Sequence, residues 1–179
     1  MLADLPEYTL TRKKMKNLRM RVVAPHGEVK VSAPLRTPVA EIDAFVASRA
    51  SWIRKMQEKA AAVPAPLEAG PEAEAARTDL RRRVPPLLSY WAGRMEVVPE
   101  PHWSPRLMRT RWGSCNSRTR KINLSLELAR RDDELLEYVI VHELAHLFEP
   151  NHGPGFYRVM DTYLPGWKAL RTRLNGREL

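Results

Sequence analysis

The chain has 179 residues, of which 44% are apolar and 28% charged, so the sequence can form a packed core and global disorder is disfavoured. Its formal net charge is +9, and residues 1–62 carry 12 Lys and Arg against 6 Asp and Glu. A nucleic acid or an acidic partner could bind this basic region, although a solvated basic surface is the simpler interpretation. The sequence has no long apolar run and no secretory signal pattern, and Cys115 is its single cysteine. We therefore expect a cytoplasmic protein without a membrane partner.

The first third of the chain predicts a β-hairpin followed by a helix. Apolar residues recur on both sides of Pro25-His26-Gly27, which is a turn sequence. Thr37-Pro38 resembles a helix start, and apolar residues then recur at helical spacing through residues 42–56. We expect a hairpin plus helix in residues 1–62, a linker-like segment rich in Ala, Pro and Glu in residues 63–76, and a catalytic region in residues 77–179. The first and last parts are expected to form one compact unit.

The second half alternates between predicted helices and strands. A helix is predicted over residues 72–95, where Pro85-Pro86 should kink or break it. Residues 121–128 place every second apolar side chain on one face of a strand. Asp132 or Asp133 could cap a helix over residues 134–148, which is apolar on most sides. A helix at residues 154–163 and a short basic helical tail follow. The expected fold class is α+β, with a central active-site helix.

The central helix contains an HExxH motif, formed by His142, Glu143 and His146. Four residues advance a helix by about 400°, so both imidazoles lie on one face and can bind one zinc ion at about 2.0–2.1 Å. Glu143 lies beside them and can accept a proton from a metal-bound water. A chance HExxH is the competing interpretation. The helical context and a third nearby histidine argue against it.

That third histidine, His152, follows His146 by six residues. The spacing matches the metzincin pattern HExxHxxGxxH, except that Glu149 stands in place of the glycine. Glu149 is therefore the competing ligand, or it could hydrogen-bond to a ligand. We favour His152 and expect one zinc ion per chain. Three protein ligands leave a fourth position for water, as in catalytic zinc sites.

A longer compound pattern includes Trp112-Gly113-Ser114-Cys115, Ile122-Asn123-Leu124, residues 138–147, Asn151-His152, Phe156-Tyr157 and, nearer the N-terminus, residues 29–34 and Ser51-Trp52-Ile53. This pattern resembles that of the YgjP-like metallopeptidases, which are related to the SprT and WLM zincins. The resemblance implies a compact zincin-like α+β fold and a single zinc held by His142, His146 and His152, with Glu143 as general base. Tyr157 stands where members commonly have Trp.

The function predicted from these features is that of a zinc-dependent metallopeptidase, which hydrolyses peptide bonds with a metal-activated water and Glu143 as general base. The strand near residues 122–128 could align an extended peptide. Two alternatives stay open. Arg109 and Arg111, expected on one strand face, would suit a zinc hydrolase of a non-peptide bond such as a nucleotide phosphoanhydride. A nucleic-acid-associated protein with structural zinc would show salt-dependent binding.

For the other notable residues, a structural role is the simpler expectation. Cys115 could be a nucleophile or a thiolate ligand, but the simpler expectation is that it packs as a small apolar residue. Gly113 is expected to serve a turn or a close approach of the backbone. Tyr157 and Tyr163 are weak candidates for oxyanion stabilisation. The remaining expectations are a core or cleft-wall position for Trp112, a solvated helix face for Arg81-Arg82-Arg83, a core position for Met160, and surface positions for His26 and His102.

Overall fold

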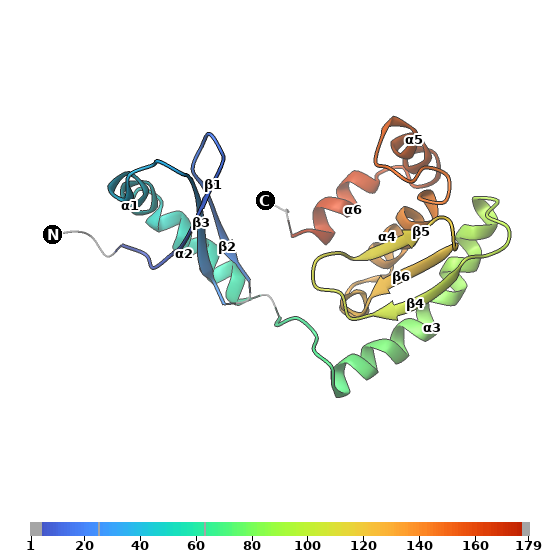
Figure 1. Cartoon of the computed structure of the whole chain (residues 1–179). Helices are drawn as coiled ribbons and strands as arrows, with labels where there is room; N and C mark the ends of the chain where they lie inside the picture. Colours follow the sequence, from blue (N-terminus) through green and yellow to red (C-terminus); the bar gives the residue numbers. More distant parts are fainter. Residues whose placement is uncertain (1–4, 25, 63, 177–179) are drawn as a thin grey trace. The chain divides into compact units, whose positions relative to one another are not determined.

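The structure, a computed structural model, describes residues 5–24, 26–62 and 64–176. Its contacts divide the chain into two compact units, Met1–Ala65 and Pro66–Leu179 (Figure 1). This division falls within the linker-like segment predicted over residues 63–76, of which residue 63 lies outside the described part. The first unit has an apolar core of its own. Its buried members are Val29, Val31, Ala33, Ile42, Val46 and Ile53.

The first unit consists of a three-stranded sheet and two helices. Strands β1 (Thr9–Lys13), β2 (Arg19–Val23) and β3 (Glu28–Pro34) have the order β1-β3-β2. Strands β2 and β3 are antiparallel, which confirms the predicted hairpin, and β1 runs parallel to β3. The single predicted helix is divided into α1 (Val39–Ala47) and α2 (Ala50–Ala61). At the break, Ser48 Oγ donates a 2.8 Å hydrogen bond to the Phe45 carbonyl, a local bond that competes with helix continuation.

The second unit has a sheet of β4 (His102–Arg106), β5 (Gly113–Asn116) and β6 (Lys121–Ser125), in the order β4-β6-β5. Strand β6 is parallel to β4 and antiparallel to β5. The strand predicted over residues 121–128 therefore ends early. Ser125 Oγ accepts a hydrogen bond from the Glu127 amide and caps a 3-10 helix, η1 (Leu126–Arg130). Leu126 and Leu128 remain buried within η1.

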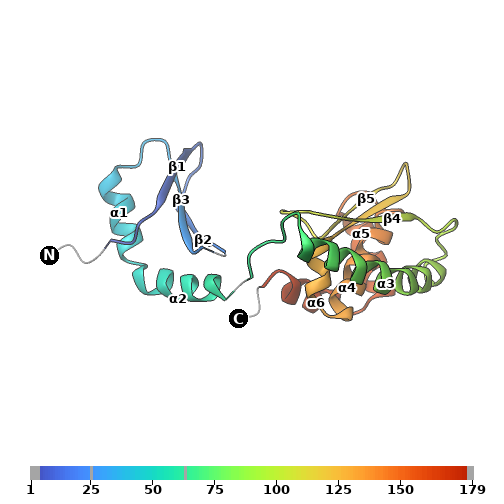
Figure 2. The same cartoon turned by 90° about the horizontal axis from the view of Figure 1, so that it is seen from below.

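Four helices complete this unit: α3 (Pro71–Arg94), α4 (Asp133–Ala145), α5 (Pro154–Tyr163) and α6 (Trp167–Leu174). Helices α3 and α4 contact the sheet, and α5 and α6 pack against α4 (Figures 1 and 2). Nine of the residues of α4 are buried, so it is the central helix of the unit. The predicted α+β class is confirmed. Among the described residues, no helix combines the length and the hydropathy of a membrane span.

Helix α3 contradicts the prediction that Pro85-Pro86 would break it, because it continues through both prolines. Each proline removes one amide donor, so the carbonyls of Arg81 and Arg82 lose their helical partners. Both prolines lie on the exposed face of α3, where water can bind those carbonyls. The opposite face of α3 stays buried on both sides of the prolines, at Leu80, Val84, Leu88 and Trp91.

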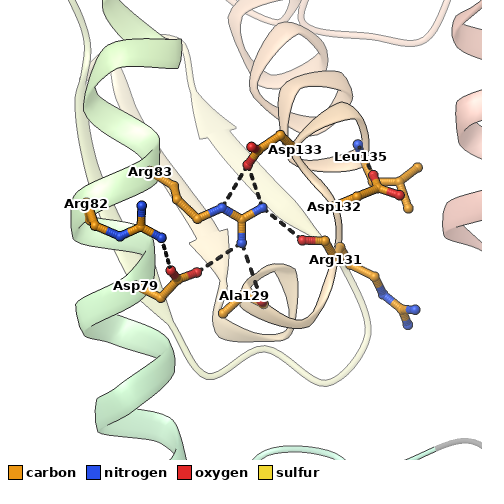
Figure 3. A network of polar contacts seen from close by, with 8 residues as sticks. All are labelled: Asp79, Arg82, Arg83, Ala129, Arg131, Asp132, Asp133 and Leu135. Carbon is orange, nitrogen blue, oxygen red and sulfur yellow. Dashed lines mark hydrogen bonds and ion pairs between the residues drawn. The ribbon is translucent and has the colours of Figure 1, made fainter.

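A polar network fixes the start of α4 to α3 (Figure 3). Arg83 of α3 donates to Asp79 Oδ2 at 2.9 Å, to Asp133 Oδ1 at 2.8 Å, and to the carbonyls of Arg131 at 2.8 Å and Ala129 at 3.3 Å. The Arg83 side chain is only 13% exposed. Of the predicted solvated run Arg81-Arg82-Arg83, only the first two residues are exposed. Arg83 instead helps to position the helix that carries HExxH.

Candidate metal centre and cleft

Three histidines from three consecutive parts of the chain converge in the second unit. His142 lies in the last turn of α4, His146 is its C-terminal cap, and His152 lies in the turn before α5. One ring nitrogen from each histidine lies within 4.8 Å of the other two, and together the three residues form a group that could hold a metal ion. Nε2 of His142 and Nε2 of His152 are 3.0 Å apart. Two nitrogens on a tetrahedral zinc lie about 3.3 Å apart, so the donor set and its spacing fit zinc.

The surroundings of His142 and His146 favour the neutral form of both imidazole rings. The Nδ1–H of His146 donates a 3.2 Å hydrogen bond to the Glu149 carbonyl, which leaves Nε2 with its lone pair. Burial, with smaller contributions from the nearby His146, His152 and Arg171, lowers the pKa of His142 to about 3. Burial also lowers the pKa of His146. Both rings are therefore neutral near pH 7, which is the form that binds a metal.

The side chain of Glu149 does not belong to the group of described residues that could hold a metal ion. It lies against the first turn of α5, since a Cβ added to Gly155 would collide with its carboxylate. Among the described residues, the metal-competent group contains His142, His146 and His152 and omits Glu149. The geometry thus favours His152 over Glu149 as the third ligand. The hydrogen bond expected from Glu149 is made by its backbone carbonyl.

Glu143 lies one residue beyond His142 on α4 and is 4% exposed. Its carboxylate contacts the backbone of Gly113 in β5, because a Cβ on Gly113 would lie only 2.8 Å from both Cγ and Cδ of Glu143. Its Oε2 is buried without a hydrogen-bond partner among the described residues. Burial raises the pKa of Glu143 to about 8, against the opposing charge of Arg111. A buried carboxyl with a raised pKa beside a metal-competent group is suited to move protons near neutral pH.

The histidines and Glu143 open into a cleft of about 670 Å³. One wall is the segment Thr110–Cys115, where Trp112 lies as expected, and the other is formed by α5 and α6. Tyr138 and Arg171 also line the cleft, although neither was predicted as a site residue. Tyr138 was accessible to sequence reasoning, because it precedes His142 by four residues and so shares its helix face. Arg171 had no such signal, since only packing brings α6 to the cleft.

Two expectations about the segment before the HExxH helix are wrong. Arg109 and Arg111 do not share a strand face, because they lie in the loop between β4 and β5. Arg111 lines the cleft, whereas Arg109 is exposed and lies 3.9 Å from Glu68. The strand at residues 121–128 cannot add a peptide at an edge, because β6 is paired on both sides.

For most of the other residues considered from the sequence, the structure agrees with the structural role that was expected. Cys115 is half-buried, and burial together with the negative charge of Glu143 raises its pKa to about 11. It is therefore a neutral thiol rather than an activated nucleophile. Met160 is fully buried, and His26 and His102 are exposed. Of the two tyrosines considered for oxyanion stabilisation, Tyr157 lines the cleft and Tyr163 does not.

Comparison with known proteins identifies one family. The YgjP-like, metallopeptidase domain family matches residues 16–77 and 72–177. The metallopeptidase zymogen abylysin of Pyrococcus abyssi is 21% identical, covering 53% of this chain and 94% of its own, with a TM-score of 0.49. The metallopeptidase zymogen jannalysin of Methanocaldococcus jannaschii is 19% identical, covering 52% and 95% of the two chains, with a TM-score of 0.46. No curated protein is significantly similar to the chain.

Proposed function

The chain belongs to the YgjP-like metallopeptidase family, and from this premise we propose that it is a zinc-dependent peptidase with a zincin-like core. The zinc ion would be held by His142, His146 and His152, one ion per chain, and Glu143 would be the general base. The observation that carries this proposal is the convergence of three imidazoles beside one buried carboxylate in an open cleft.

The zinc ion and Glu143 would have separate roles in hydrolysis. When bound, zinc supplies Lewis-acid chemistry, which lowers the pKa of water and polarises a carbonyl. Glu143 accepts a proton from the attacking water and passes it to the leaving amine. The backbone of Gly113 lies against the carboxylate and would help to orient the proton acceptor before the substrate arrives.

Strand β5 is the proposed guide for an extended peptide. It lies at an edge of the sheet β4-β6-β5, and its residues Gly113, Ser114 and Cys115 line the cleft. An edge strand offers free amide and carbonyl groups, so a peptide can add beside it as a further strand. This arrangement would place a scissile bond near Glu143. It replaces the alignment first expected for residues 122–128.

The first experiment measures zinc and peptidase activity together. Untagged protein purified without chelators should contain about one zinc per chain by elemental analysis, and His142→Ala should lose most of it. Glu143→Gln should keep the zinc and lose about 100-fold or more of the turnover on a mixed peptide library. Absence of zinc after reconstitution at micromolar metal, or near-normal turnover of Glu143→Gln, would overturn the proposal.

The same preparations separate the alternative functions. A panel of nucleoside triphosphates tests hydrolysis of a phosphoanhydride, with Glu143→Gln as the control. Binding of DNA or RNA that falls steeply with salt and survives Glu143→Gln would favour a nucleic-acid-associated protein with structural zinc. Peptide cleavage dependent on Glu143, without either of these signals, supports the peptidase.

A further inference from the structure

Beyond the histidines, the cleft continues into a second hollow of about 490 Å³ along α6. It is lined by Tyr157, Trp167, Lys168, Arg171, Thr172 and Asn175. Four of these residues, Tyr157, Trp167, Arg171 and Asn175, also line the cleft of the metal centre. We propose that this hollow, the α6 subsite, binds a carboxylate of the peptide substrate through Arg171 and Lys168. The inference rests on the proposed peptidase function and adds a substrate preference to it.

Two stacked aromatic rings line the α6 subsite. The rings of Tyr157 and Trp167 are stacked, with centroids 5.5 Å apart and planes inclined by 3°. Trp167 is 4% exposed, and its Nε1 donates a 2.7 Å hydrogen bond to Asp161 Oδ1. The ammonium group of Lys168 lies 5.5 Å from the centre of the Trp167 ring. An apolar surface beside a cation supports the stem of a bound side chain and favours its charged end.

The charge of the α6 subsite is positive and is not neutralised by the described residues. Its lining contains Lys168 and Arg171 but no Asp or Glu. Within the described part of the chain, no carboxylate forms an ion pair with either cation. Arg173, two residues further along α6, differs in this respect, because it pairs with Asp132 and Glu134 at the start of α4. Helix α6 thus carries two arginines with different roles: Arg173 pairs with acidic residues at the start of α4, and Arg171 lines the cleft.

Arg171 lines the cleft of the metal centre as well as the α6 subsite, and Arg111 lines the opposite wall of that cleft. A substrate bound between these walls therefore meets guanidinium groups on both sides, and Glu143 is the only acid that lines the cleft among the described residues. Such a field favours an anionic peptide over a cationic one.

A carboxylate is the ligand that this chemistry selects within a peptide. The planar guanidinium of Arg171 can donate two parallel hydrogen bonds to its two oxygens. The carboxylate has two sources, an Asp or Glu side chain near the cleaved bond or the C-terminus of a short peptide. Both use the same contacts, and the substrate set below distinguishes them.

The test compares matched peptides with matched variants. One quenched-fluorescent peptide series carries Glu, Gln or Lys at each position around the cleaved bond, and a second ends in a free carboxylate or an amide. Wild-type protein should cleave the best Glu or free-carboxylate peptide about tenfold faster, in kcat/KM, than its neutral partner. Arg171→Gln should remove this preference, chiefly through KM. Arg158→Gln, which changes an exposed arginine of α5 outside the cleft, should leave it intact.

A binding measurement tests the α6 subsite without requiring that the protein cleave a peptide. Fluorescence anisotropy of the same labelled peptides is measured on Glu143→Gln and on Glu143→Gln combined with Arg171→Gln. The single variant should bind the anionic peptide about tenfold more tightly than the neutral one, and the double variant should not. If wild-type cleaves no peptide but this difference persists, the peptidase proposal fails and the α6 subsite stands. Equal affinities for anionic and neutral peptides, or equal effects of Arg171→Gln and Arg158→Gln, would overturn the subsite.

Discussion

The backbone of Gly113 lies against the carboxylate of Glu143, so that the edge strand of the sheet and the proposed general base are in direct contact. A Cβ at position 113 would lie 2.8 Å from Cγ and from Cδ of Glu143, closer than real side chains approach. The requirement for glycine at position 113 comes from this contact and not from its backbone angles, because the φ angle of Gly113 is not positive. The glycine therefore leaves room for the buried carboxylate beside the strand that lines the cleft.

Gly113→Ala should displace Glu143 and reduce peptidase activity. A shift of about 1 Å in a catalytic group can lower the rate by about 100-fold, so we expect a loss of that order in kcat with zinc content unchanged. Gly93→Ala is the matched control, because a Cβ there meets nothing within 4 Å and alanine is favoured in a helix by about 0.5–1 kcal/mol. Activity within twofold of wild type in Gly113→Ala would show that the contact does not position the base.

His152→Ala and Glu149→Ala should differ in zinc affinity. Loss of His152 removes a proposed ligand, and we expect affinity to fall by more than about 100-fold in a chelator competition. Glu149→Ala keeps the backbone carbonyl that accepts from His146, so its affinity should stay within about tenfold. The reverse order would identify Glu149 as the ligand.

Arg83→Ala should destabilise the second unit. The arginine makes hydrogen bonds to Asp79, Asp133 and two backbone carbonyls, and its removal takes away all of these bonds, although Asp79 keeps its ion pair with Arg82. We expect a loss of about 2 kcal/mol in the free energy of unfolding, measured in urea. Arg82→Ala is the control, because Arg82 is exposed and, among the described residues, its ion pair is with Asp79 alone, so it should change stability by less than about 0.5 kcal/mol. Equal effects would show that the Arg83 network contributes little.

Cys115 should react slowly with iodoacetamide in the folded protein. Burial and the charge of Glu143 raise its pKa to about 11, so about one thiol in a thousand is ionised at pH 8, against about one in four for an ordinary cysteine. The rate should rise about tenfold per pH unit up to pH 11. Because the folded pKa exceeds the unfolded one, the thiol's contribution to stability is complete below about pH 8.5 and is lost toward pH 11. Rapid modification at pH 8, equal to that of urea-unfolded protein, would contradict the raised pKa.

The sequence by itself determined the chemistry of the candidate site. HExxH in an apolar helix, with His152 six residues on, names the three imidazoles and the carboxylate, because their spacing along one helix and one turn is local. The α+β class, the first hairpin and the cap at Asp132 followed from hydrophobic period and capping chemistry. These features depend on residues close together in the chain.

Only the tertiary structure decided what surrounds the site. The order β4-β6-β5 makes β5 the edge strand, and pairing order is not encoded in the alternation of any single strand. The packing of α6 on α4 brings Arg171 to the cleft and Arg173 to the start of α4. The direction of the Glu149 carboxylate toward α5 likewise depends on how α5 packs. Contacts between residues far apart in the chain are set by packing and burial, so local patterns could not predict them.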